Sequence, residues 1–363
     1  MVERTHAPQG SSLVPAAVAR RHVGRLFEKM GVPEVEADLV GEVLVSADMK
    51  GIHSHGLARV PYFLLRLERG VMDPNPAMEF TRGSATTGVL DARNGVGIVA
   101  ADRAMTEAMN MAHSHGSGFV VVKGSSHFGY AGFWSERAMQ SGFIGISLSN
   151  SGRRVAPTFG MEAVLGTNPL SVAIPGGEDD FLLDMASSAV AVGKVETALR
   201  EGRSIPPGWV VDPQRVGLDE NGVLTFDTPL VPLGGPGVES GGHKGYGLGL
   251  MIELLCGALG GAPFADRLAG AGGEAPAAMG HFLGALKVEG FRDPAAMQGD
   301  MDELFQAIRA SARVPGEDRI YIHGEPERSA WETAHEEGIE VSAPVRRQLD
   351  RWAGRLGVAP LEA

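Results

Sequence analysis

The stretch that decides the fold covers residues 87–149 and reads TGVLDARNGVGIVAADRAMTEAMNMAHSHGSGFVVVKGSSHFGYAGFWSERAMQSGFIGISLS. Within it, residues 87–92, 118–123 and 143–149 are short apolar runs typical of strands. Residues 98–113 and 131–141 show the apolar spacing of helices. Because strands and helices alternate, the sequence predicts an α/β core.

The two ends of the chain are different in character from this core. Helical spacing predicts helices over residues 14–30, 34–49 and 57–70, and again over 329–337 and 344–356. We therefore expect a helical domain or layer formed by residues 1–80 together with 325–363, and an α/β domain over residues 81–324. Inside the latter, residues 206–236 are expected to form a loop and residues 319–322 a strand.

Composition narrows the class of protein. The 363 residues are 44% hydrophobic and 21% charged, with a net charge of −12, so the overall field opposes nucleic acid and anionic membranes. An anionic substrate would need a local basic pocket, for which Arg59 and the His243-Lys244 pair are candidates. The single cysteine, Cys256, excludes an internal disulfide, and residues 1–12 lack the apolar run of a signal peptide. We expect a cytoplasmic protein.

The segment GIHSHGLAR, residues 51–59, contains two imidazoles, a hydroxyl and a guanidinium. His55 and Arg59 are four residues apart and would share one face of a helix. An imidazole moves protons near neutral pH, and a guanidinium binds a carboxylate through two parallel hydrogen bonds. The segment thus describes a site for a small acid. The alternatives are a metal-binding pair, His53 and His55, or a basic surface turn.

Two glycine-containing segments follow strands and precede helices. Residues 95–100 match G-x-G-x-x-A, but the next strand ends in KGS instead of the acidic residue of a Rossmann site, so we interpret the glycines as a tight turn. Residues 123–129, KGSSHFG, place amides at a helix N-terminus, a geometry that suits anions. His127 there is a candidate acid or base, or else a histidine that only caps the loop.

Three further strings supply polar groups at expected strand or helix ends. They contain Thr167 in GTNP, Asp184 in DMASS, and His243-Lys244 in GHKGYG. Asp184 could bind ribose hydroxyls or cap the next helix, and Lys244 could contact a phosphate or carboxylate. No C-x-x-C, H-E-x-x-H or P-loop string occurs, so no metal site is indicated beyond the isolated His53-x-His55 pair.

In this order, the strings resemble one family, the malate/L-lactate dehydrogenases of the second, non-Rossmann type. The matching strings are HSHG with Arg59 and Pro61, SHFG, GTNP, DMA, Ile205-Pro206 with Trp209, and HKGYGL, and the resemblance spans about residues 15–350. The family includes malate, lactate, ureidoglycolate and sulfolactate dehydrogenases and a reductase of cyclic imino acids. The resemblance implies a homodimer whose α/β domain binds NAD or NADP with an unusual fold.

The resemblance also implies roles for individual residues. Arg59 would clamp the substrate carboxylate, with Thr167 nearby, and the proton would be carried by His127 or by Ser54-His55. The resemblance implies that the following residues contact the cofactor: His127, Phe128, Gly129, Tyr130, Ala131, Ser151, Asp184, Met185, Ala186, His243, Lys244, Gly316 and Glu317. The reaction implied is hydride transfer between the nicotinamide and the carbon α to a carboxylate.

Three functions remain open from the sequence. The first is a 2-hydroxyacid dehydrogenase acting on a malate- or lactate-type substrate. The second is an imine reductase on the same scaffold, which would add hydride to a cyclic imino acid. The third is a metal-dependent hydrolase built on His53 and His55, which would need further ligands. In each case the expected partner is a small molecule, with no nucleic acid and no membrane.

Overall fold

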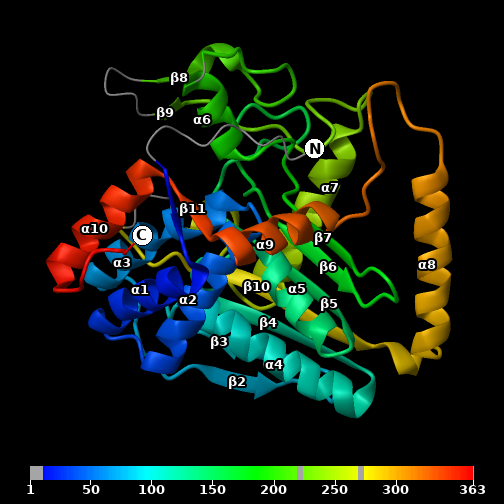
Figure 1. The fold of residues 1–363 in the computed structure, drawn as a ribbon, viewed down its shortest axis with the longest axis horizontal. Helices are drawn as coiled ribbons and strands as arrows, with labels where there is room; N and C mark the ends of the chain where they lie inside the picture. Colours follow the sequence, from blue (N-terminus) through cyan, green and yellow to red (C-terminus); the bar gives the residue numbers. More distant parts are fainter. Residues whose placement is uncertain (1–10, 201, 219–223, 269–273, 363) are drawn as a thin grey trace.

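A seven-stranded mixed sheet forms the centre of the computed structural model, which describes residues 11–200, 202–218, 224–268 and 274–362 (Figure 1). The strand order is β2-β3-β4-β10-β5-β6-β7. Only β3 and β4 run parallel, and every other neighbouring pair is antiparallel. The strands span Glu79–Arg82 (β2), Thr87–Asp91 (β3), Ser117–Ser125 (β4), Phe143–Ser149 (β5), Leu170–Ile174 (β6), Phe181–Met185 (β7) and Met279–Lys287 (β10). This mixed α/β sheet confirms the predicted fold class and lacks the parallel order of a Rossmann domain.

Helices cover the two faces of the sheet. Helix α4 (Gly97–His115) lies on β4 and β10, and α5 (Ala131–Gln140) lies on β5 and β6 (Figure 1). The opposite face is covered by α7 (Gly242–Glu253) and the π-helical turn Leu254–Ala258 that follows it. There, Ile252 and Cys256 pack against Leu148 of β5. The sheet is therefore buried on both sides, which explains the apolar runs of its central strands.

The N- and C-terminal segments form a helical layer beside the sheet. It contains α1 (Ala16–Lys29), α2 (Glu34–Met49), α3 (Val60–Glu68), α9 (Glu325–Glu337) and α10 (Ala343–Leu356). Two short strands, β1 (Ser12–Val14) and β11 (Ile339–Val341), pair antiparallel and join the two ends. One hydrophobic cluster runs from this layer into the face of the sheet under α4. The division into two domains stays a prediction.

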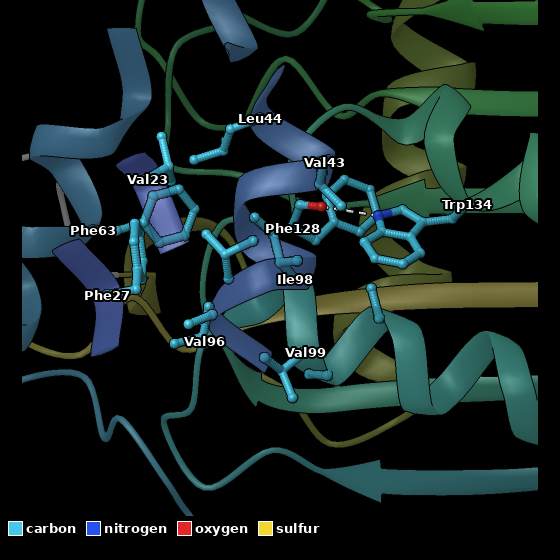
Figure 2. Packing of buried hydrophobic residues seen from close by; sticks show 14 of the residues in the cluster. Val23, Phe27, Val43, Leu44, Phe63, Val96, Ile98, Val99, Phe128 and Trp134 are labelled. Carbon is cyan, nitrogen blue, oxygen red and sulfur yellow. Dashed lines mark hydrogen bonds between the residues drawn. The ribbon is translucent and has the colours of Figure 1, made fainter. Parts of the chain in front are cut away.

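Aromatic and aliphatic side chains connect the layer to the core (Figure 2). The Phe27 and Phe63 rings lie 5.9 Å apart, centre to centre, between α1 and α3. Farther along, Phe128 precedes α5, and its carbonyl oxygen accepts a 2.8 Å hydrogen bond from Trp134 Nε1 (Figure 2). Both Trp134 and Phe63 are fully buried. The loop that carries residues 126–130 is thus buried between the helical layer and the sheet.

The G-x-G-x-x-A segment begins α4 and packs against protein backbone. The Gly97 amide donates a 2.8 Å hydrogen bond to Ser126 Oγ, and a Cβ at Gly97 would overlap the carbonyl oxygens of Ser126 and His127. This helix N-terminus therefore touches residues 126 and 127. The interpretation of these glycines as a turn and helix start is confirmed.

The remaining predictions of secondary structure have mixed outcomes. Residues 319–322 are irregular, so the predicted strand is wrong, although the His323 carbonyl accepts a hydrogen bond from the Leu182 amide. Residues 206–236, which were predicted to be a loop, contain the short strands β8 (Val216–Leu218) and β9 (Leu224–Phe226). Helix α6 (Val192–Arg200) precedes this segment. Strands β1, β2 and β11 were not predicted. The prediction that residues 1–12 contain no signal peptide concerns mostly residues 1–10, which lie outside the described residues.

Helix α8 (Pro294–Ala310) lies apart from the sheet, at the right of Figure 1. Phe305 is its one buried residue, and Asp302 and Arg309 bond it to Glu178 and Glu325. On α7 and the turn after it, Leu250, Met251, Leu254 and Leu259 are 36–61% exposed. Within the described residues, no helix has the length and apolarity needed to cross a membrane.

Substitution of Gly97 by alanine tests the contact between α4 and the 126–127 backbone. Because the added Cβ must displace backbone, we expect Gly97→Ala to lower the free energy of unfolding by about 1–3 kcal/mol. The matched control is Gly299→Ala in α8, where a Cβ meets no atom within 4 Å. There alanine should stabilise the helix by roughly 0.5–1 kcal/mol. Chemical denaturation measures both, and equal stability of the two variants would contradict the packing.

Candidate active site

One cavity of about 860 Å³ lies between the helical layer and the sheet. Most of the residues predicted for the site line its wall: Ser54, His55, Arg59, His127, Gly129, Tyr130, Ala131, Ser151, Thr167, Asp184, Met185 and Ala186. They come from parts of the chain more than 100 residues apart. The structure thus brings together the HSHG, SHFG, GTNP and DMA strings.

A buried carboxylate holds the first of these strings. Asp48, at the end of α2, accepts a 2.7 Å hydrogen bond from the Leu57 amide and lies 3.0 Å from His53 Nδ1. A Cβ at Gly56 would overlap this carboxylate, so position 56 accepts only glycine without rearrangement. Burial raises the pKa of Asp48, whereas the bond to Asp48 raises the pKa of His53. Asp48 was not predicted, although a charge at an apolar position of a helix is a recognisable signal.

The string itself forms two 3₁₀ turns, His53–His55 and Leu57–Arg59, separated at Gly56. His55 and Arg59 are therefore not on one α-helical face, as the spacing had suggested, yet both line the cavity. Ser54 Oγ lies 2.8 Å from His55 Nδ1, and Arg59 Nε donates to the Ser54 carbonyl oxygen at 2.7 Å. These bonds leave His55 Nε2 and the terminal nitrogens of Arg59 available to a ligand.

The SHFG string places a second imidazole beside the first. The rings of His55 and His127 lie 5.4 Å apart, centre to centre, and the rings of Tyr62 and Phe63 pack against His127 in T-shaped arrangements. The Gly129 amide donates a 3.1 Å hydrogen bond to His127 Nδ1. Gly129 has a φ of +85°, and a Cβ there would meet Val43 Cγ1 at 2.5 Å. Glycine is thus required for the turn that brings this amide back to the ring.

The bond from Gly129 fixes the tautomer of His127. A nitrogen that accepts a hydrogen bond has no proton, so the neutral ring carries its proton on Nε2. Protonation of Nδ1 would set it against the Gly129 N–H. His55 differs, because its Nδ1 faces a hydroxyl that can accept or donate. The two imidazoles therefore have different capacities to take up a proton.

Burial and positive charge keep both rings neutral. Burial, together with the charge of Arg59, lowers the pKa of His55 to about 4. Burial holds the pKa of His127 well below its ordinary value, and Arg59 and His55 add to the effect. A ligand carboxylate bound to Arg59 would cancel much of this charge and raise the pKa of His55.

The GTNP string is anchored by its asparagine. Asn168 Nδ2 donates to Glu253 at 2.6 Å, and its Oδ1 accepts from the Ser151 amide at 3.1 Å. Ser151 Oγ in turn accepts from the Thr167 amide at 3.1 Å. Asn168 is fully buried in this network, which holds Ser151 and Thr167 at the cavity wall.

Asp184 occupies the N-terminus of α5. Its Oδ2 accepts a 2.8 Å hydrogen bond from the Gly132 amide. The helix end predicted to suit an anion therefore already holds a carboxylate of the protein. Burial raises the pKa of Asp184 to about 6. Close to pH 6 this side chain at the cavity wall is divided between an acceptor and a donor form.

Two further arginines reach the cavity. Arg153 and Arg154 follow Ser151 and line the same cavity as Arg59. Burial lowers the pKa of Arg59, and the nearby charge of Arg154 lowers it further. The cavity thus gathers positive charge in a chain whose net charge is −12.

Some predicted residues lie outside this cavity wall. Phe128 is buried against His281, His243 and Lys244 are exposed at the start of α7, and Gly316 and Glu317 lie in an exposed turn after α8. Their cofactor contacts stay predictions. The wall includes residues that the sequence did not suggest: Lys50, Tyr62, Arg66, Tyr321, His323 and Glu327. Among the described residues, no three His, Cys, Asp or Glu side chains are grouped as metal ligands would be.

Comparison with known proteins identifies the family. The family model described as malate/L-lactate dehydrogenase matches residues 14–350. The chain belongs to this family. It is 36% identical over 362 residues to a malate dehydrogenase of Pyrococcus abyssi, covering 100% of both chains. The solved malate dehydrogenase of Pyrococcus horikoshii OT3 superposes with a TM-score of 0.89 at 33% identity, over 99% of this chain and 100% of the other.

Two other members of the malate/L-lactate dehydrogenase family are named with their cofactors. The ureidoglycolate dehydrogenase (NAD(+)) of Escherichia coli K12 is 33% identical over 345 residues, 92% of this chain and 94% of its own. The (2R)-3-sulfolactate dehydrogenase (NADP(+)) of Chromohalobacter salexigens is 35% identical over 307 residues, 82% of this chain and 88% of its own.

The link between Arg59 and His55 predicts a shift in titration. Because the charge of Arg59 contributes to the low pKa of His55, Arg59→Gln should raise that pKa above about 4, with burial still holding it below 6.5. Titration of the His55 ring protons by NMR measures it. In the control, Arg82→Gln removes a charge from an exposed site on β2 and should leave the His55 titration unchanged. An unchanged His55 titration in Arg59→Gln would contradict the electrostatic coupling.

Proposed function

We propose that this protein catalyses hydride transfer between NAD(P)H and the α-carbon of a small 2-oxo acid, with the 2-hydroxy acid as the reduced product. The chain is a 2-hydroxyacid dehydrogenase by family. The observation that carries the proposed chemistry is the shared cavity wall, where Arg59 can bind a carboxylate beside the two imidazoles of His55 and His127.

The cavity fits a dinucleotide cofactor together with a small substrate. Its volume of about 860 Å³ lies in the upper part of the range for ligand sites. At the start of α6, a Cβ on Gly193 would meet no protein atom within 4 Å, so this glycine leaves room at the wall. Asp184, Met185 and Ala186 would hold the cofactor. When bound, a nicotinamide supplies or accepts the hydride. Relatives carry either NAD(+) or NADP(+) in their names.

The arginines define the substrate. Arg59 would bind the carboxylate next to the reacting carbon through its terminal nitrogens, because its Nε is already bonded to Ser54. Arg154 and Arg153 would attract a second acidic group on the same substrate. We therefore favour a malate-type diacid over a lactate-type monoacid.

The two histidines divide the proton chemistry. In reduction, His127 donates a hydrogen bond from Nε2 to the oxo oxygen of the substrate and stays neutral. His55, as an imidazolium whose Nδ1–H donates to Ser54, transfers its Nε2 proton to the oxygen as the carbon receives the hydride. Substrate bound to Arg59 favours the charged form of His55. In oxidation, His55 takes the hydroxyl proton back.

We also propose that the protein is a homodimer. The exposed apolar side chains Leu250, Met251, Leu254 and Leu259, which we call the α7 face, and the separated helix α8 support this. Apolar groups of this kind, gathered on one surface, mark interaction sites. The buried, free Cys256 suits the proposed cytoplasmic location.

A substrate panel tests the function. Absorbance at the nicotinamide band should show turnover of oxaloacetate above that of pyruvate, and above that of a cyclic imino acid, with NADH or NADPH. Arg154→Gln should lower kcat/KM for oxaloacetate at least about tenfold, or ~1.4 kcal/mol, and change that for pyruvate little. Arg153→Gln, which removes the neighbouring charge, is the matched variant for which the same two kcat/KM values are measured. Equal losses for both oxo acids would remove the second anion site, and preference for the imino acid would favour an imine reductase.

Glutamine and alanine variants separate the roles of the histidines. A glutamine amide can replace the Nε2–H of His127 as a donor but carries no mobile proton. We expect His127→Gln to retain much more activity than His127→Ala, whereas His55→Gln and His55→Ala should both lose about 10²–10⁴ in kcat. Steady-state kinetics at saturating cofactor measure all four variants. If His127→Gln is as inactive as His127→Ala while His55→Gln is active, the proton belongs to His127.

Light scattering after size exclusion tests the dimer. Leu254→Glu puts a charge on the α7 face and should halve the mass at micromolar concentration. Val35→Glu makes the same kind of change at an 82% exposed position on α2 and should leave the mass unaltered. A monomeric parent protein, or an unaltered dimer in Leu254→Glu, would contradict the proposed surface.

A further inference from the structure

His281 is a fully buried histidine to which neither the family strings nor the proposed chemistry gives a role. It lies on β10, the strand between β4 and β5, and its register partners are Val122 on one side and Ser149 on the other. A histidine in the centre of an apolar sheet is costly unless its nitrogens are hydrogen-bonded. Its partners therefore show what it holds in place.

Both ring nitrogens of His281 are bonded. Nδ1 lies 2.8 Å from Ser149 Oγ. Nε2 lies 2.8 Å from Ser125 Oγ and 3.1 Å from the carbonyl oxygen of Ser126. The imidazole also stacks on Phe128, with 4.5 Å between the ring centres and 10° between the planes. His281 thus contacts the residue before His127 and the residue after it.

These contacts define the state of the ring. A carbonyl oxygen only accepts, so the contact with Ser126 requires the proton on Nε2 and leaves Nδ1 as an acceptor. Nδ1 faces the Ser149 hydroxyl, which also donates to the Asn150 carbonyl oxygen at 2.9 Å. Burial lowers the pKa of His281 to about 3, so the ring stays neutral at neutral pH. A charged imidazolium here would repel the positive charge of the neighbouring cavity. The neutral ring binds its neighbours without adding to the positive charge of the site.

Other contacts hold the same segment from other sides. The Ser126 hydroxyl accepts from Gly97, and the Phe128 carbonyl accepts from Trp134 (Figure 2). Each of these reaches one flank of His127 only. His281 bonds the carbonyl oxygen of Ser126, before His127, and packs on the ring of Phe128, after it. It can therefore set the angle between these two residues. That angle decides where the imidazole of His127 points.

We propose that His281 is a positioning residue, which directs His127 Nε2 into the cavity by holding the Ser126 carbonyl and the Phe128 ring at the same time. The proposal rests on the proposed function, in which that nitrogen donates to the substrate oxygen. A displacement of a positioned group by about 1 Å can cost about 10²-fold in rate. The effect of His281 should fall on the chemical step and spare cofactor binding.

Two variants of His281 separate its two contacts. His281→Phe keeps a ring on Phe128 and loses every hydrogen bond, whereas His281→Gln can still donate to the Ser126 carbonyl. We expect His281→Phe to lower kcat at least about tenfold, when kcat is expressed per cofactor-binding site. The cofactor Kd should change less than about twofold. His281→Gln should recover part of kcat. The solvent deuterium isotope effect on kcat should rise in His281→Phe, because proton transfer becomes slower relative to the other steps.

A milder variant is available if the substitutions of His281 do not fold. Ser149→Ala leaves the imidazole in place, removes the hydroxyl that faces Nδ1 together with its bond to the Asn150 carbonyl oxygen, and should lower kcat at least about threefold. Its matched control is Ser171→Ala on β6, which removes a buried hydroxyl bonded to Ser135 at 2.6 Å and should change kcat less than about twofold. Unaltered kcat and isotope effect in His281→Phe, or in Ser149→Ala where only that variant folds, would overturn the proposal.

An independent readout separates this proposal from the proposed function. The ¹⁵N shifts of the His127 ring report whether Nδ1 still accepts from Gly129, and need no turnover. We expect a mixture of tautomers in His281→Phe, or in Ser149→Ala, and a single Nε2–H form in the parent and in Ser171→Ala. If the parent reduces no 2-oxo acid but the shifts change in this way, the function fails and the positioning stands. If turnover occurs and the shifts stay constant, the positioning fails.

Discussion

The hydroxyl of Ser126 makes the contact on which the arrangement of the site depends. It accepts a hydrogen bond from the Gly97 amide at the start of α4 and lies 3.1 Å from the Gly95 carbonyl oxygen. This ties the end of β4 to the first turn of α4 and fixes the backbone of His127 between them. The segment after it is closed by Gly129, which lies against Val43 of α2. The loop of residues 126–130 is thus held by the sheet on one side and by the helical layer on the other, with His127 between these contacts.

The electrostatics of the cavity follow from the same burial. The net charge of the chain is −12, yet arginines line this cavity. Burial and their positive charge lower the pKa values of His55 and His127, so both rings are neutral. The free site is therefore charged by its arginines, and neither imidazole is in its protonated, imidazolium form. A bound carboxylate changes this balance, since it compensates Arg59 beside His55. In the proposed reaction, substrate binding and the availability of the proton would in this way be coupled through a single side chain, Arg59.

Local sequence predicted those elements whose limits are set locally. Helix α2 has the predicted limits because Pro33 precedes it and Gly51, with a φ of +75°, follows it. Strands β1 and β11 depend on a partner at the other end of the chain, and no local pattern marks such short pairs. Residues 319–322 have the composition of a strand but form no ladder with one, and only the next residue, His323, bonds to β7, so they run irregularly. Most of the residues that the family strings predicted for the site line the cavity. They did not supply Asp48 or His281, whose roles depend on distant contacts: a carboxylate under a turn, and an imidazole between two strands.

The pairing of β1 with β11 has a consequence for how the protein is made. Arg346 bonds Ser12, 334 positions earlier in the chain, and the two short strands meet in the same region. During synthesis the segments that carry Asp48 and HSHG emerge long before the strand and helices that complete their layer, β11, α9 and α10. Contacts so distant along the chain close slowly, because a long loop must be ordered before they form. Part of the apolar surface of α1 and α2 therefore remains uncovered until β11 and α10 have been synthesised, and apolar surface exposed for that time favours aggregation of the nascent chain.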